Sequence, residues 1–145
     1  MKTKQELLQA LAKQNGGILT AEAVVAAARP EESPLHDSFE WDDSEASRLW
    51  RLHQARNIIL KIKVEMQGGS DGDPLTVRVW SSLTPDRENE GGGYRQTVAI
   101  MKNKDMRAQL LEDAFYEMER FAEKYRCLSE LAEVFMAIRR ARKGT

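Results

Sequence analysis

The chain has 145 residues, of which 41% are hydrophobic and 31% charged, and its formal net charge is -1. This balance is typical of a globular protein and excludes both a strongly basic nucleic-acid coat and an acidic mimic of DNA. A single cysteine, Cys127, excludes an internal disulfide and a cysteine-based zinc site.

The apolar runs of the sequence are too short to predict a signal peptide or a membrane span. The N-terminus becomes polar within a few residues and lacks the run of roughly 7–15 apolar residues that a signal peptide needs. No stretch approaches the ~20 apolar residues of a membrane span. We therefore expect a protein of the cytoplasm.

Two short helices are predicted at the start of the chain. Thr3 and Glu6 have the spacing of a capping box, and the helix that they begin should end at Gly16 and Gly17. Thr20 is expected to cap a second helix over residues 21–28.

A long acidic loop follows the second helix. Residues 31–45 contain seven carboxylates and neither lysine nor arginine. Leu35, Phe39 and Trp41 interrupt this polarity, and we expect them to pin the loop onto the body of the protein. In an alternative interpretation Phe39 or Trp41 is an exposed anchor that, with Asp42 and Asp43, binds a basic partner surface.

A third helix is predicted to begin at Asp43 or Ser44 and to run to about Leu60. It carries two apolar bands at helical spacing, and a helix with two such bands is usually sandwiched between neighbouring elements. His53 lies on one of these bands and is expected to be a core histidine.

Strand patterns follow the third helix. Alternating residues over 61–66 and 75–81 predict a β-hairpin, and residues 94–100 are expected to supply a third strand. Apolar residues at helical spacing over 104–143, interrupted near Cys127, predict either an antiparallel helical pair or one bent helix. Cys127 itself is expected to be a small core residue.

The predicted fold is therefore α+β, with N-terminal helices, a β-hairpin and a C-terminal helical pair. We expect a domain over residues 1–100 and a helical region over residues 101–145 that packs on it or pairs two copies into a homodimer.

The order of the first 83 residues (helix, short strand, helix, helix, hairpin) is that of a winged-helix domain, whose third helix enters the DNA major groove. Five cations and no anion lie between residues 47 and 64. An ordinary buried helix is the alternative, and the acidic loop would repel phosphates if it shared a face with this helix. The residues predicted to contact DNA are Arg48, Arg51, Gln54, Arg56, Lys61 and Lys63.

A glycine run, residues 91–93, precedes Tyr94 and Arg95. Its backbone amides and Arg95 are candidates for a phosphate contact, with Tyr94 stacking on a base, so a small nucleotide is a weaker third candidate ligand. The run matches neither the P-loop nor the dinucleotide fingerprint, and a mobile connection is the alternative.

No pattern indicates catalysis. His36 and His53 lie on different predicted elements, and nothing in the local sequence brings Cys127 near either. We expect a binding protein rather than an enzyme, with no cofactor and no metal.

Six segments along the chain carry a resemblance: SPLHDSFEWDD (33–43), RLHQAR (51–56), EGGGY (90–94), RAQLL (107–111), KY (124–125) and LSELA (128–132). They resemble segments of a group of small phage and prophage proteins, and the resemblance spans nearly the whole chain. It implies a protein made by a phage inside a bacterial host, acting in phage DNA metabolism, in gene control or against host defences. In the last case the partner of the acidic loop would be a host protein that the chain inhibits.

Overall fold

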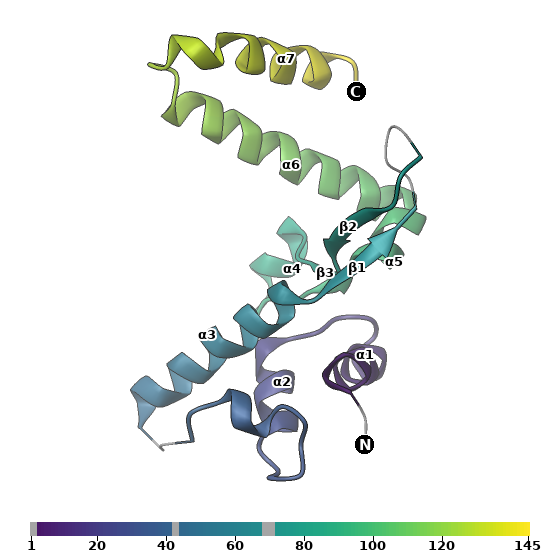
Figure 1. Cartoon of the computed structure of the whole chain (residues 1–145), viewed down its shortest axis with the longest axis vertical. Helices are drawn as coiled ribbons and strands as arrows, with labels where there is room; N and C mark the ends of the chain where they lie inside the picture. The colour runs from purple at the N-terminus through teal and green to yellow at the C-terminus, as the bar shows by residue number, and fades with distance from the viewer. Residues whose placement is uncertain (1–2, 42–43, 68–71) are drawn as a thin grey trace. The chain divides into compact units, whose positions relative to one another are not determined.

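A computed structural model describes residues 3–41, 44–67 and 72–145 (Figure 1). The protein is α+β, as predicted, with helices at both ends of the chain and short antiparallel sheets between them. The chain divides into two compact units, Met1–Lys102 and Asn103–Thr145, which are described in turn.

The first unit begins with α1 (Lys4–Gln14) and α2 (Ala21–Ala28). The capping box is present, because the Thr3 hydroxyl accepts from the Glu6 amide at 3.2 Å and Glu6 accepts from the Thr3 amide at 2.7 Å. Thr20 caps α2 by accepting from the amide of Ala23. Both predicted helices are therefore confirmed, and local capping explains where each begins.

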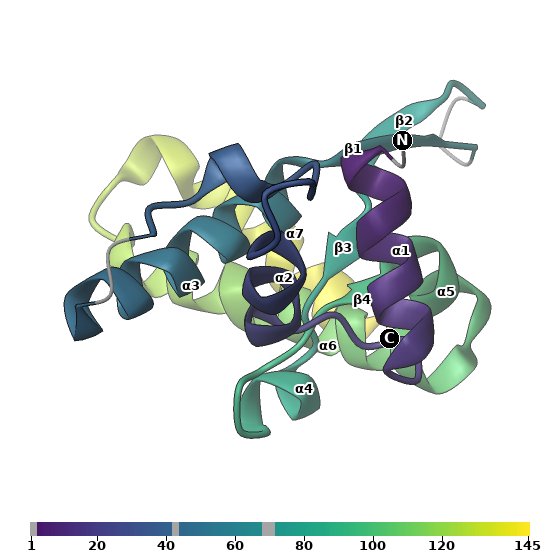
Figure 2. The ribbon, with the colours of Figure 1, turned by 90° about the horizontal axis from the view of Figure 1, so that it is seen from below.

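The core of this unit joins α1, α2 and the next helix, α3 (Glu45–Lys61), with α2 lying between the other two helices (Figure 2). Ser44 caps α3 through the amide of Ser47, and the covered face of α3 contributes Ala55 and Ile59, both fully buried. Leu8, Val24 and Trp80, which come from the surrounding elements, are also fully buried.

Only one of the two apolar bands of α3 is covered. Leu52, Ala55 and Ile59 are buried, whereas Leu49 is 54% and Trp50 53% exposed. The prediction of a sandwiched helix is therefore wrong. His53 lies on the exposed band, so its predicted place in the core is wrong as well.

A β-hairpin follows α3, as predicted, but it is shorter than expected, because Lys61 still belongs to α3 and Trp80 and Ser81 pair in a second sheet. Strands β1 (Lys63–Met66) and β2 (Leu75–Arg78) pair antiparallel, with Lys63 opposite Arg78. Leu19 forms an antiparallel bridge with Tyr94 and not with the hairpin. The winged-helix order of elements is thus present, but the short extended segment after α1 pairs elsewhere.

The rest of the first unit surrounds a second two-stranded sheet, formed by β3 (Trp80–Ser81) and β4 (Arg95–Gln96). The short helix α4 (Thr84–Glu88) connects them, and α5 (Thr97–Lys102) follows β4 directly. The strand expected over residues 94–100 is therefore limited to two residues, since the chain turns into a helix at Thr97.

The second unit is an antiparallel helical pair and not one bent helix, which was the other predicted possibility. Helix α6 (Lys104–Lys124) is followed by a 3-10 turn, η2 (Ser129–Leu131), and by α7 (Ala132–Lys143). Near the end of α7, Arg142 contacts Glu112 of α6 through two hydrogen bonds of 2.6 Å.

The surface of this pair is rich in exposed side chains. Cys127 is exposed in the turn between α6 and η2, so its predicted place in the core is wrong. Large apolar side chains are also exposed, including Tyr116 at 60% and Met136 at 49%. That two copies of this pair form a homodimer stays a prediction.

Across the described ranges, no helix combines the length and the apolar character needed to cross a membrane.

Candidate functional site

The indole of Trp41 fixes the acidic loop in place. Its ring stacks on His36, with centroids 5.1 Å apart and an interplanar angle of 15°. The guanidinium carbons of Arg29 and Arg51 each lie 5.6 Å from its centroid, and its N–H donates to the His36 carbonyl at 3.1 Å. This packing bears out the expectation that the loop is pinned to the body.

Arg51 and Gln54 hold the loop against one side of α3. Arg51 is 4% exposed, and its Nη1 donates to the carbonyl of Glu40 at 3.0 Å. The side-chain oxygen of Gln54 accepts from the Glu40 amide at 3.3 Å. Arg51 is therefore too buried to contact DNA as predicted, and the carbonyl of Gln54 is already bonded. The acidic loop shares this side of the helix.

The same packing tests the prediction that Phe39 or Trp41 is an exposed anchor for a partner protein. Phe39 is 8% exposed, so its predicted role as an exposed anchor is wrong. Trp41 is half-buried within the cluster just described. Asp42 and Asp43, the other two residues of that prediction, lie outside the described residues.

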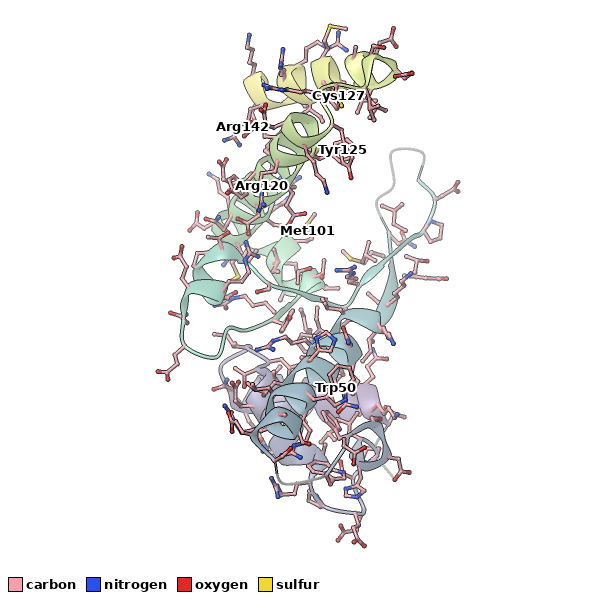
Figure 3. All side chains as sticks on the ribbon, turned by 90° about the vertical axis from the view of Figure 1, so that its left-hand side faces the viewer. Trp50, Met101, Arg120, Tyr125, Cys127 and Arg142 are labelled. Carbon is pink, nitrogen blue, oxygen red and sulfur yellow. The ribbon has the colours of Figure 1, made fainter. Side chains whose placement is uncertain are left out.

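The outer face of α3 carries an aromatic pair in the open. Trp50 and His53 stack with ring centroids 5.2 Å apart and an interplanar angle of 26°. The side-chain amide of Asn57 lies 3.0 Å from Nε2 of His53. Positions 50, 53 and 57 are three and four residues apart and so share one helix face. In Figure 3 Trp50 is marked on the ribbon of α3.

Cations continue from this face into the root of the hairpin. Arg56 and Lys61 are exposed on α3, and Lys63 and Arg78 are exposed opposite each other on β1 and β2. Like charges placed directly opposite in a sheet are destabilising, so the Lys63–Arg78 pair does not serve the fold. One carboxylate, that of Glu65, lies nearby on β1.

Arg48 differs from these cations because it is already paired. Its guanidinium makes three hydrogen bonds of 3.0–3.2 Å with Glu45, one helical turn earlier. Hydrogen bonding to Arg48 lowers the pKa of the Glu45 carboxyl, and the same bonds raise the pKa of Arg48. Of the six predicted DNA contacts, Arg56, Lys61 and Lys63 are exposed and have no carboxylate paired with them among the described residues.

The glycine run lies beside a pocket of about 410 Å³ in the first unit. Tyr94 is half-buried in its lining, as the prediction of a ligand contact requires. Arg95 instead binds Asp86 through two hydrogen bonds of 2.8 Å, and Asp86 is 3% exposed. Hydrogen bonding to Asp86 raises the pKa of Arg95. Arg95 therefore braces the structure, and it does not line the pocket.

Two exposed residues of these sites were not among the contacts predicted from the sequence. The ring of Trp50 could stack on a base, but its apolar band predicts burial, and Arg78 belongs to no motif. The signal for Arg78 was its register, since counting back from the hairpin turn places it opposite Lys63.

Among the residues that the structure describes, no group of three or more histidine, cysteine or acidic side chains is placed to hold a metal ion. Comparison of the chain with protein-family models, with curated proteins and with solved structures gave no match.

Proposed function

We propose that the protein binds single-stranded nucleic acid along the outer face of α3 and the root of the β1–β2 hairpin. The observation that carries this proposal is the exposed Trp50–His53 stack on α3. Three exposed cations lie farther along the chain: Lys61 at the end of α3, and the facing pair Lys63 on β1 and Arg78 on β2. We call these five residues the α3 outer surface.

The chemistry of the α3 outer surface suits an unpaired strand. Exposed aromatic rings stack on bases, and each such stack contributes roughly 1–3 kcal/mol whatever the base. Lysine and arginine side chains neutralise phosphates along the backbone. The sequence from residue 46 to 64 contains no carboxylate that would oppose this charge.

A strand with accessible bases is favoured over a duplex. Reading a major groove would need polar side chains of α3 that are free to reach base edges, and Gln54 is bonded to the loop. Glu40 and the loop also lie on the Arg51 side of the helix, where a carboxylate repels phosphates. The wider role that we propose is that of a non-enzymatic accessory protein of phage type, in DNA metabolism or gene control.

The alternative, inhibition of a host protein through the acidic loop, has less support. Of its two aromatic anchors, Phe39 is buried and Trp41 is enclosed by His36, Arg29 and Arg51.

The test is fluorescence anisotropy with labelled single-stranded DNA, single-stranded RNA and duplex DNA, at low and at near-physiological salt. We expect single strands to bind more tightly than the duplex, with an affinity that falls steeply as salt rises. Comparison of DNA with RNA shows whether the ribose 2′-hydroxyl matters.

A matched pair of variants distinguishes binding by the α3 outer surface from a general effect of the protein's net charge. The triple variant K61Q/K63Q/R78Q removes three exposed cations of the α3 outer surface, and K13Q/K102Q/R107Q removes three exposed cations elsewhere. The first should weaken binding and flatten its salt dependence, while the second should change both much less. Equal loss in both variants, or no binding of any strand at low salt, would contradict the proposal.

A further inference from the structure

The pocket beside the glycine run has the features of an anion site. Its volume, about 410 Å³, is within the range of roughly 300–1,000 Å³ typical of small-ligand pockets. It is built from α3, the end of β3, α4 and the turn that leads into β4. The glycine run lines it together with Arg56, Ser82, Arg87, Asn89 and Tyr94.

Two guanidinium groups from different elements converge on this pocket. Arg56 reaches it from α3 and Arg87 from α4. Arg87 is held in position, because its Nη1 donates to the Ser82 carbonyl at 2.6 Å and its Nη2 to the Thr84 hydroxyl at 2.5 Å. A guanidinium whose orientation is fixed is well suited to a phosphate, which it contacts in a planar, bidentate manner.

The glycine turn supplies a wall without side chains. Gly91 and Gly92 have φ values of 81° and 66°, which favour glycine, and the Gly92 amide donates to the Asn89 carbonyl at 2.9 Å. The turn is anchored next to this bond, because Leu19 and Tyr94 exchange backbone hydrogen bonds of 2.7 and 2.8 Å. A ligand can therefore approach the backbone closely.

Within the described part of the chain no carboxylate lines the pocket, and its two charged lining residues are both arginines. Asp86 is held in an ion pair by Arg95, and neither residue lines the pocket. The carboxylate of Glu22 approaches the turn, with Oε2 3.1 Å from where a Cβ on Gly91 would lie. Glu88 and Glu90 are exposed and lie outside the lining. The lining itself is therefore cationic, as an anion site requires.

We infer that this pocket binds the phosphate group of a nucleotide, with the half-buried ring of Tyr94 available to the base. Two sources carry the same chemistry: a free nucleoside monophosphate, and the 5′-terminal phosphate of a strand. The inference is independent of the α3 outer surface, and Arg56 is the residue of α3 that turns toward the pocket.

The experiment is isothermal titration of the full chain with adenosine and thymidine 5′-monophosphates, with the matching nucleosides as controls. A second arm compares an oligothymidine bearing a 5′-phosphate with the same strand ending in a hydroxyl. Saturable binding of the free monophosphates assigns the pocket to nucleotides. Preference only for the 5′-phosphorylated strand assigns it to strand ends.

Three variants tie binding to the pocket. R87Q and R56Q should each weaken binding roughly tenfold, the loss expected for one charge-assisted hydrogen bond. E22Q should tighten binding, since it removes the opposing carboxylate. The control R48Q, on α3 but paired with Glu45, should leave the affinity for monophosphates unchanged.

Arg87 also makes bonds within the fold, so R56Q keeps the inference testable if R87Q does not fold. Absence of saturable binding in both arms would overturn it, as would binding that neither R56Q nor R87Q weakens. Replacement of Trp50 by alanine should weaken strand binding but leave monophosphate binding intact, so the two proposals can fail separately.

Discussion

Trp50 and His53 stack on the outer face of α3, with ring centroids 5.2 Å apart, and Asn57 contacts the far side of the pair through Nε2 of His53. More than half of the Trp50 side chain is exposed. Large aromatic side chains left in the open on a helix commonly mark a binding surface. Here the neighbouring cations favour nucleic acid as the ligand.

Arg51 is expected to stabilise the fold and not to contact the ligand. Replacing it with alanine removes the hydrogen bond to Glu40 and the contact with the Trp41 ring, which should lower the free energy of unfolding by about 1–3 kcal/mol. Urea unfolding followed by circular dichroism measures this loss. The control R48A removes an exposed cation of the same helix and should hardly alter the urea midpoint. Equal midpoints for wild type and R51A would contradict the assignment.

Gly93 is required for space. A Cβ at this position would lie 2.5 Å from Cγ2 of Ile18, so G93A should destabilise the first unit by about 1–3 kcal/mol, as overpacking does. The double variant G93A/I18A removes the clashing methyl group and should cost less than the sum of the single variants. G144A, where the nearest atoms lie 3.7 Å away, is the control. Strict additivity of the two substitutions in thermal melts would argue against this contact.

The helical pair is expected to lose stability in acid. Hydrogen bonding to Arg142 lowers the pKa of the Glu112 carboxyl in the folded state. A carboxyl whose folded pKa is lowered contributes stability above its unfolded pKa, and this is lost as the pH falls through the folded pKa. E112Q should therefore be less stable than wild type at neutral pH, and the difference should shrink below about pH 4, near the ordinary pKa of glutamate. Because Glu112 is exposed, the effect should be small and reduced by salt.

The matching measurement is thermal melting of both proteins across this pH range. The isosteric variant E119Q is a control, since Glu119 lies farther from Arg142, at 3.7 Å. A stability difference between E112Q and wild type that stays constant with pH would contradict the assignment.

The parts of the fold that were predictable from sequence are those set by local interactions. Thr3 and Thr20 cap helices that begin where expected, because capping depends on residues within one turn. The hairpin followed from alternation over a few residues on each side of its turn. The strand predicted over residues 94–100 was too long, because the chain turns into α5 at Thr97.

The parts that were not predictable depend on which neighbour covers a surface. Arg51 and Arg56 are five positions apart on one helix, yet the loop around Trp41 covers the first and leaves the second exposed. Trp50 and His53 lie on an apolar band that predicts burial, yet both are exposed, because no other element among the described residues of the first unit packs over this band. The pairing of Arg95 with Asp86, nine residues earlier, is likewise a tertiary contact.

The most direct test of the central claim is the intrinsic fluorescence of Trp50 during titration with a short single strand. Of the three tryptophans, Trp80 is fully buried and Trp41 is packed in its cluster, so Trp50 is the one exposed to a ligand. We predict strong quenching in the wild type at the affinity found by anisotropy. W50F should bind with similar affinity, because its ring still stacks, but with little quenching, and W50A should bind more weakly. Strand binding that leaves Trp50 fluorescence unchanged, or an equal affinity in W50A, would contradict the account.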